Sequence, residues 1–300
     1  MILNGVLVAD GFAEAFPMRA TRVVITADEP AWAMTAAEAM TGFATSVIAC
    51  GCEAGVEREL PAEDTPDGRP GVAVLLFAMS DAELGRQLVA RVGQCVLTCA
   101  STACFAGIEG GDAKAPLGKS LRFFGDGYQV AKKIGERRYW RVPVMDGEFL
   151  VEHDTGIVAA VGGGNFLILA TSRVAAQAAA EAAVGAMRRL PNVALPFPGG
   201  IVRSGSKVGS KYPKLIASTN DAYCPTLRSR APRTALPREV EAVLEIVIDG
   251  ITEADVAEAT AVGVRAACAL GRSGGVVAID AGNYGGKLGP YHFHLRKLLS

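Results

Sequence analysis

The sequence holds little of several residue types that mark common protein classes. Its three histidines offer no Ser/His/Asp set, and its seven cysteines lack the paired Cys-x-x-Cys spacing of a zinc ribbon. Lys and Arg number 30 against 31 for Asp and Glu, so the chain has no general attraction for nucleic acid or an anionic membrane. Only 20% of the residues are charged and 50% are hydrophobic, which argues against disorder and allows a large core.

Long apolar runs are also absent. The Ala-rich stretch 171–187 comes nearest to a membrane span, but charged and polar residues interrupt it. The N-terminal region contains Asp10 and Glu14 and lacks the basic start of a secretory signal. We therefore expect a cytoplasmic protein.

The odd number of cysteines argues against a set of disulfides in such a compartment. We expect buried, unreactive thiols that behave as small hydrophobic residues, with a metal site as the alternative. Cys95, Cys99 and Cys104 lie in one segment and could supply a nucleophile, but nothing in the sequence marks any of them as activated.

The two halves of the chain contain a weak internal repeat. The pattern Ala-Glu-Ala-x-x-Gly at 37–42 recurs at 180–185, inside Ala-rich helical segments. A strand-like apolar segment precedes each copy, at 23–26 and at 166–169. Each half therefore begins with a strand that leads into a helix.

A second matched pair follows in each half. The apolar strands 72–79 and 243–248 each precede a helical pattern. Ser80 begins the first helix with a capping-box pattern, because Glu83 stands three residues later, and Thr252 begins the second with a poorer version of it. Further strands are expected at 45–49, at Val202 and around 214–217.

The order β-α-β-β-α-β, found twice, predicts an α+β fold of two ferredoxin-like lobes. We place the lobes at residues 1–150 and 151–300, with the boundary near Gly147–Gly156 and an inserted loop region at about 204–237. The glycines at 162–164 precede a strand, which predicts a tight turn and excludes a dinucleotide-binding fingerprint. Chance similarity between Ala-rich helices is the alternative to a duplication.

Glu245 is the most informative single residue. It lies among apolar neighbours in the strand 243–248, and alternation places it on the same face as Val243 and Val247. A carboxyl group on an apolar face has a raised pKa, so it can stay protonated and donate to a developing oxyanion. A water-exposed Glu at the face of the sheet is an equal alternative.

Two glycine-rich segments could bind ligands. Residues 203–211 alternate Gly, Ser and Lys and suit an anion, although the spacing is not that of a P-loop. Residues 281–289 contain four glycines around Asn283, Tyr284 and Lys287, and a heteroaromatic ring could stack on the tyrosine. A solvated surface loop and an ordinary turn are the alternatives for the two segments.

Taken together, these segments resemble one known family, the formylmethanofuran:tetrahydromethanopterin formyltransferases. The resemblance extends in register over essentially the whole chain. The segments that carry it are 4–6, 12–16, 21–27, 41–43, 46–48, 65–71, 93–99, 123–128, 163–166, 196–200, 204–209, 217–220, 224–227, 245–250 and 282–289.

The resemblance implies two ferredoxin-like lobes, a homo-oligomer built from dimers, and no metal or prosthetic group. It also implies reversible formyl transfer between N5 of tetrahydromethanopterin and the amine of a methanofuran-type carrier, both with anionic tails. In the family a glutamate of the Glu-Ile-Val-Ile-Asp-Gly segment assists the tetrahedral intermediate, and here that residue is Glu245. The residues expected to bind the two carriers are Ser204, Ser206, Lys207, Asn220, Asn283, Tyr284 and Lys287.

The nearly neutral, Ala- and Arg-rich composition suggests the bacterial branch of the family. For that branch the resemblance implies a multi-subunit formyltransferase/hydrolase complex. Two other interpretations stay open. A hydrolase would release formate without a furan carrier, and a scaffold subunit would bind pterin without turnover.

Overall fold

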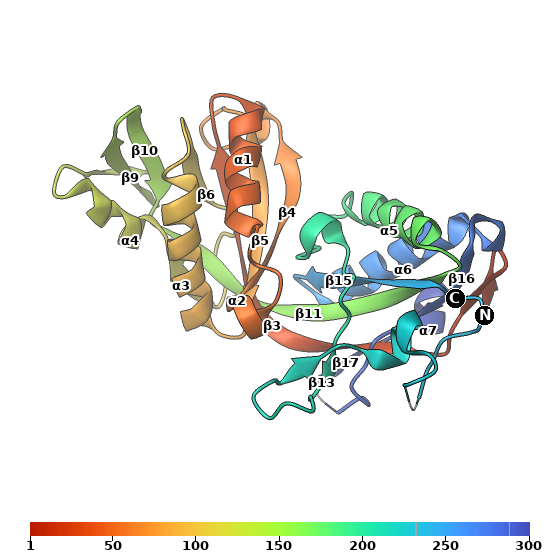
Figure 1. Ribbon diagram of the computed structural model, residues 1–300. Helices are drawn as coiled ribbons and strands as arrows, with labels where there is room; N and C mark the ends of the chain where they lie inside the picture. Colours follow the sequence, from red (N-terminus) through yellow and green to blue (C-terminus); the bar gives the residue numbers. More distant parts are fainter. Residues whose placement is uncertain (232, 288) are drawn as a thin grey trace. The chain divides into compact units, whose positions relative to one another are not determined.

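The computed structural model describes residues 1–231, 233–287 and 289–300, and its fold is a mixture of α-helices and β-strands (Figure 1). Pro232 of the expected inserted loop and Leu288 of the glycine-rich segment lie outside the described residues. The chain forms two compact units. Unit 1 contains Met1–Pro17 and Val161–Ser300, and unit 2 contains Met18–Ala160.

Unit 2 has the element order β-α-β-β-α-β at its centre. Its strands lie in the order β4-β5-β3-β6, and each neighbouring pair is antiparallel. Strand β10 continues the sheet parallel to β6, followed by β9 and β8. The elements are β3 (Phe12–Thr26), α1 (Pro30–Thr41), α2 (Val47–Cys50), β4 (Glu53–Leu60), β5 (Gly71–Ala78), α3 (Asp81–Arg91), β6 (Ala103–Ala106), β7 (Ala113–Pro116), α4 (Gly118–Leu121), β8 (Val130–Ile134), β9 (Arg137–Val144) and β10 (Gly147–Glu152).

Unit 1 repeats this order. Its strands lie in the order β16-β11-β15-β12, again with antiparallel neighbours, and β2 of the N-terminal residues pairs parallel to β16. The elements are β1 (Ile2–Leu3), β2 (Val6–Val8), β11 (Asp154–Ala170), α5 (Arg173–Met187), β12 (Val193–Ala194), β13 (Lys207–Val208), β14 (Ala217–Ser218), β15 (Ala242–Gly250), α6 (Glu253–Ala269), β16 (Val276–Asp280), β17 (Tyr291–His294) and α7 (Leu295–Leu299).

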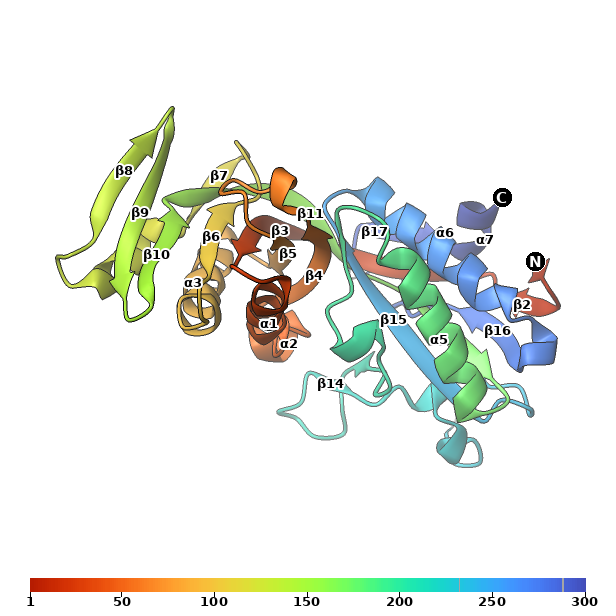
Figure 2. The ribbon, with the colours of Figure 1, turned by 90° about the horizontal axis from the view of Figure 1, so that it is seen from above.

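The two faces of the unit 1 sheet have different covers. Helices α5 and α6 lie side by side over one face (Figure 2), where Phe166, Ile168, Ile246 and Ile248 are fully buried. On the other face the segment between β12 and β15 supplies the cover, and Leu236 and Val240 pack there in a cluster with Leu167, Leu169, Tyr223 and Val243. Alternation along β15 therefore places the odd-numbered residues beneath a loop rather than beneath helices.

Several predicted elements are found. The segments 23–26, 72–79, 166–169 and 243–248 are parts of strands β3, β5, β11 and β15, and the two repeated Ala-rich segments are helices α1 and α5. The ranking of the two helix caps is wrong. Thr252 and Asp255 form the complete capping box, whereas Glu83 turns its carboxylate to Arg86 and Gln87 and leaves Ser80 as a simple N-cap.

Two local predictions are also wrong. Residues 45–49 were expected as a strand, but Ser46 caps the short helix α2, and Gly51 ends it in a left-handed conformation. The glycines at 162–164 form no tight turn, because they lie inside β11 at an irregularity of its pairing with β15. Such a bulge lets one long strand bend without ending.

All seven cysteines are free thiols. Four are buried, namely Cys50, Cys52, Cys104 and Cys268, and the other three are half-buried. Burial raises the pKa of the Cys268 thiol to about 11, which keeps it protonated and unreactive. In the part of the chain that the structure describes, no helix has both the length and the apolar character to cross a membrane.

Candidate functional site

Glu245 lies in the middle of strand β15, between two neighbouring backbones. On one side it pairs with Leu167 of β11. On the other side its N–H and C=O exchange hydrogen bonds of 2.9 and 2.8 Å with Val202. Its backbone is therefore held on both sides, and its side chain projects from the face that the loop covers.

The Glu245 side chain is half-buried and lines a narrow hollow of about 40 Å³. Burial raises the pKa of its carboxyl to about 7. The surroundings explain this shift, because Leu167, Val202 and Val243 replace water around the group. At neutral pH a large fraction of the group is protonated and able to donate a hydrogen bond.

Polar residues of the loop region line the same hollow as the carboxyl. Its wall includes Arg203, Ser204, Asn220, Tyr223 and Cys224. Residues with hydroxyl, amide and guanidinium groups thus share the wall of this hollow with one titratable carboxyl. An arrangement of this kind can bind a polar substrate and stabilise a developing oxyanion.

A larger hollow of about 490 Å³ adjoins the first one. The two share Val202, Arg203, Ser204 and Leu244 in their walls. The rest of the larger hollow is mainly apolar, with Phe197, Pro198 and Ile201, together with Gln177 of helix α5. The composition of this wall suits a flat, mainly apolar organic group.

The predicted residues of the 203–211 loop divide into two groups. Ser204 lies in the walls of both hollows, and Asn220 lies in the wall of the smaller one. Ser206 and Lys207 are exposed and are not among the residues that line these hollows. The ammonium group of Lys207 forms an ion pair with Asp221, and this pair lowers the pKa of that carboxyl.

In the glycine-rich segment that begins at residue 281, the Asn283 and Tyr284 side chains make contacts that fix the conformation of the loop. The Asn283 amide donates to the Phe12 carbonyl at 3.2 Å and accepts from the Gly285 N–H at 3.0 Å. Tyr284 is half-buried with its ring 6.1 Å from that of Phe16, and Lys287 is exposed. None of the three is among the residues that line the two hollows beside Glu245.

Sequence reasoning overlooked Glu14 as a site residue. Its fully buried carboxylate accepts backbone N–H bonds from Tyr284 at 2.8 Å, Gly286 at 2.9 Å and Gly289 at 2.6 Å. The glycine-rich loop therefore wraps around this carboxylate. The signal was available, because Glu14 stands between apolar residues of a strand just as Glu245 does.

Arg203 and Tyr223 were also missed as individual site residues. Arg203 was noted only as the first residue of its loop, and Tyr223 carries no motif. Both line the hollow beside Glu245. The Tyr223 hydroxyl donates a 2.7 Å hydrogen bond to Asp280, a contact between segments far apart in the sequence.

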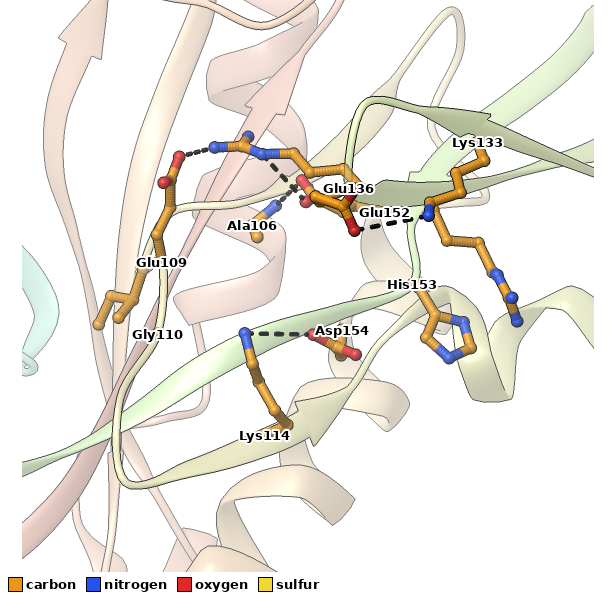
Figure 3. Close-up of a pocket in the computed structure, with 12 residues that line it drawn as sticks. Ala106, Glu109, Gly110, Lys114, Lys133, Glu136, Glu152, His153 and Asp154 are labelled. Atoms are coloured by element: carbon orange, nitrogen blue, oxygen red, sulfur yellow. Dashed lines mark hydrogen bonds and ion pairs between the residues drawn. The ribbon is translucent and has the colours of Figure 1, made fainter.

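Unit 2 contains another polar hollow, of about 490 Å³ (Figure 3). Its charged side chains largely pair with one another. Lys114 lies 3.4 Å from Asp154, Lys133 lies 3.5 Å from Glu136, and Arg137 forms ion pairs with Glu109 and Glu152. Because these charges offset one another, the hollow has less to offer a charged substrate than the site of Glu245.

His153 also lines the unit 2 hollow, but its chemistry is restricted. The indole N–H of Trp140 donates to its Nδ1 at 2.9 Å. Burial is the main cause that lowers the pKa of His153, so the ring is a neutral acceptor at this nitrogen. Among the described residues no cluster of His, Cys, Asp and Glu side chains could hold a metal ion.

Comparisons with known proteins converge on one family. A family model described as formylmethanofuran-tetrahydromethanopterin formyltransferase matches residues 1–144, and one described as FTR, proximal lobe, matches residues 147–298. The chain is 64% identical to the formylmethanofuran–tetrahydromethanopterin formyltransferase of Methylococcus capsulatus, with 100% of each chain covered.

Two solved structures are also similar. One is the formyltransferase/hydrolase complex FhcABCD from Methylorubrum extorquens in complex with methylofuran, with 56% identity, a TM-score of 0.96, and coverage of 100% of this chain and 99% of that chain. The other is the formylmethanofuran:tetrahydromethanopterin formyltransferase from Methanosarcina barkeri, with 46% identity, a TM-score of 0.94, and coverage of 99% and 100%.

Proposed function

Because the chain belongs to the formylmethanofuran-tetrahydromethanopterin formyltransferase family, we propose that Glu245 is the acid of its formyl transfer. The chain is an N-formyltransferase of one-carbon metabolism. It moves a formyl group between N5 of tetrahydromethanopterin and the amine of methanofuran or a related furan carrier. The observation that carries the assignment of Glu245 is its half-buried carboxyl, with a pKa of about 7, in a hollow that opens beside a larger apolar one.

The reaction begins when the acceptor amine attacks the formyl carbon. The C=O double bond becomes a single bond, and negative charge develops on the oxygen. A protonated Glu245 donates a hydrogen bond or its proton to this oxygen in surroundings of low polarity. The attacking nitrogen loses a proton, the donor nitrogen takes up a proton as its C–N bond breaks, and the carboxyl regains its own proton when the carbonyl forms again.

Substrate alignment is the second contribution of the site. Transfer between two amines gains most from holding both carriers at the reacting distance. Ser204 and Asn220 are placed to bind polar groups beside Glu245, and Arg203 suits an anionic or flat part of a carrier. Lys287, with its exposed ammonium, and Ser206 are proposed to meet the more distant parts of the carriers.

For Lys207, Asn283 and Tyr284 we propose a more indirect role. The Lys207–Asp221 ion pair and the Asn283 hydrogen bonds hold the loops that surround the carriers. The Tyr284 ring remains a candidate surface for stacking on a heteroaromatic carrier. In this arrangement the loops shape the binding site for the carriers, and Glu245 donates the proton.

At the level of the whole chain, the proposal includes two ferredoxin-like lobes that arose by duplication. The duplicated sequence segments are 1–150 and 151–300. The repeated order β-α-β-β-α-β with antiparallel neighbours supports this origin. By analogy with the Methylorubrum complex, we propose that this chain associates with hydrolase subunits. The proposal also includes a cytoplasmic location and, as the family resemblance implies, a homo-oligomer.

The pH dependence of transfer tests the acid role. Because only the protonated carboxyl donates, the transfer rate should fall as the pH rises through about 7. The comparison is with Glu245→Gln, in which this decline should be absent, while any effect of amine protonation persists. Equal declines above pH 7 in both proteins would assign the titration to another group.

A further inference from the structure

A partly buried hydrogen bond joins the loop cover of unit 1 to its sheet. The Tyr223 hydroxyl donates to Oδ2 of Asp280 at 2.7 Å, at the end of strand β16. The other carboxylate oxygen of Asp280 accepts the Ala281 N–H at 2.8 Å. Asp280 is thus fixed at the sheet and serves as an anchor for the tyrosine.

The sheet register places this anchor in the same row as Glu245. Leu167 of β11 lies opposite Glu245 on one side and opposite Asp280 on the other. Residues directly opposite one another in antiparallel strands project from the same face. The two carboxyl groups therefore lie on one face of the sheet, about 10 Å apart at the backbone because two strand spacings separate them.

Tyr223 covers part of this row. It packs in the apolar cluster with Leu167, Leu169 and Leu236, and it lines the hollow with Glu245. Burial and the Asp280 carboxylate raise the pKa of the Tyr223 hydroxyl above its usual range, so it remains a donor at neutral pH. Its segment also carries Asn220, whose C=O accepts the Tyr223 N–H at 3.0 Å.

We infer that Tyr223 is a positioning residue for formyl transfer, and that its hydrogen bond to Asp280 holds segment 219–224 against the sheet and keeps water away from Glu245. This inference rests on the proposed acid role of Glu245. The tyrosine need not touch a carrier. It controls the surroundings of the proton donor and the place of Asn220.

Among the described residues that line the smaller hollow, the charged or titratable ones besides Glu245 and Tyr223 are Arg203 and Cys224. Arg203 comes from the loop after Val202, and Cys224 comes from the same segment as Tyr223. Asp221 of that segment is paired with Lys207. Asp280 lies beyond Leu167, at a distance where solvent and salt weaken its influence.

Tyr223→Phe removes the hydroxyl and keeps the ring. If the segment loosens, water reaches Glu245, and the pKa of its carboxyl should move down toward the ordinary value by about half a unit to one unit. Exposed Tyr212 lies in the same loop region, so Tyr212→Phe is the matched control and should leave the pKa unchanged.

The titration is best followed by difference infrared spectroscopy of the carboxyl band, assigned by subtraction of Glu245→Gln, because this readout does not require turnover. The pH profile of transfer should show the same downward shift, with a several-fold loss of kcat at pH 7. An unchanged or raised titration midpoint in folded Tyr223→Phe would overturn the inference, because water admitted by a loosened segment must lower the midpoint. A shifted midpoint in a protein without transferase activity would support the positioning and reject the proposed function instead.

Discussion

Two glutamates in apolar strands of unit 1 have opposite surroundings. Glu14 is fully buried and accepts the backbone N–H groups of Tyr284, Gly286 and Gly289. Glu245 faces a hollow, and no hydrogen bond between described residues involves its carboxyl. Donors that stabilise an anion suit Glu14 to a structural role, whereas a half-buried carboxyl without a donor from the described residues suits Glu245 to proton donation.

Replacing Glu14 by Gln should destabilise the folded chain. The amide would place an NH₂ group where the carboxylate accepts backbone N–H bonds, and the unsatisfied donors should cost about 1–3 kcal/mol. Thermal unfolding of Glu14→Gln against Glu59→Gln, an exposed residue of β4, measures this effect. If both variants unfold at the wild-type temperature, Glu14 does not organise the loop.

Single residues also show how far sequence reasoning reached. Glu245 could be identified because alternation in an apolar strand leaves a carboxyl no polar neighbour. The loop residues Lys207 and Asn283 are predicted to contact carriers, and the structure adds internal partners for both, namely Asp221 and Phe12. A motif in one segment does not reveal such partners, because they come from elsewhere in the fold.

At the scale of elements, helices α5 and α6 each contain a glycine, and the surroundings of the two glycines differ. Gly185 of α5 is exposed, and a methyl group added there would meet no atom within 4 Å. Gly263 of α6 is buried, and an added Cβ would lie 2.5 Å from Met187 Sδ and 3.0 Å from the Phe166 ring. The second glycine therefore allows the helix to approach its neighbours closely.

Alanine substitutions should separate these two cases. Gly185→Ala should stabilise the chain by about 0.5–1 kcal/mol, because alanine favours the helix. Gly263→Ala should destabilise it by about 1–3 kcal/mol through overpacking. Denaturant unfolding of the two variants provides the comparison, and stabilisation by both would mean that α6 does not pack closely at Gly263.

Strong hydrophobic patterns predicted the strands and helices well. They could not predict where a local hydrogen bond from a polar side chain would change the structure. Strands β5 and β15 were evident because their apolar runs are bounded by helix-starting residues. Residues 45–49 have a similar composition, yet the Ser46 hydroxyl accepts the Ile48 N–H and starts a helical turn. One side-chain bond outweighs weak strand propensity in so short a segment.

At the scale of the whole molecule, the compact units do not follow the order of the sequence. Residues 1–17 belong to the unit formed by the second half of the chain, where β2 pairs with β16 and β17 pairs with β3 at residues 12–15. A repeat detects the common strand and helix order of the halves. It cannot reveal that residues 1–17 belong to the other unit, because these residues have no counterpart in the repeat.

We propose that this chain transfers formyl groups and that Glu245 is the acid of the reaction. The most direct measurement is transfer from N5-formyl-tetrahydromethanopterin to a furan-carrier amine by wild type and by Glu245→Gln, with formate release followed in the same reactions. We expect transfer without formate release by wild type, and a loss on the order of a hundredfold or more in the variant. Full transfer by the variant would contradict the acid role, and no transfer by folded wild type supplied with both carriers would contradict the function.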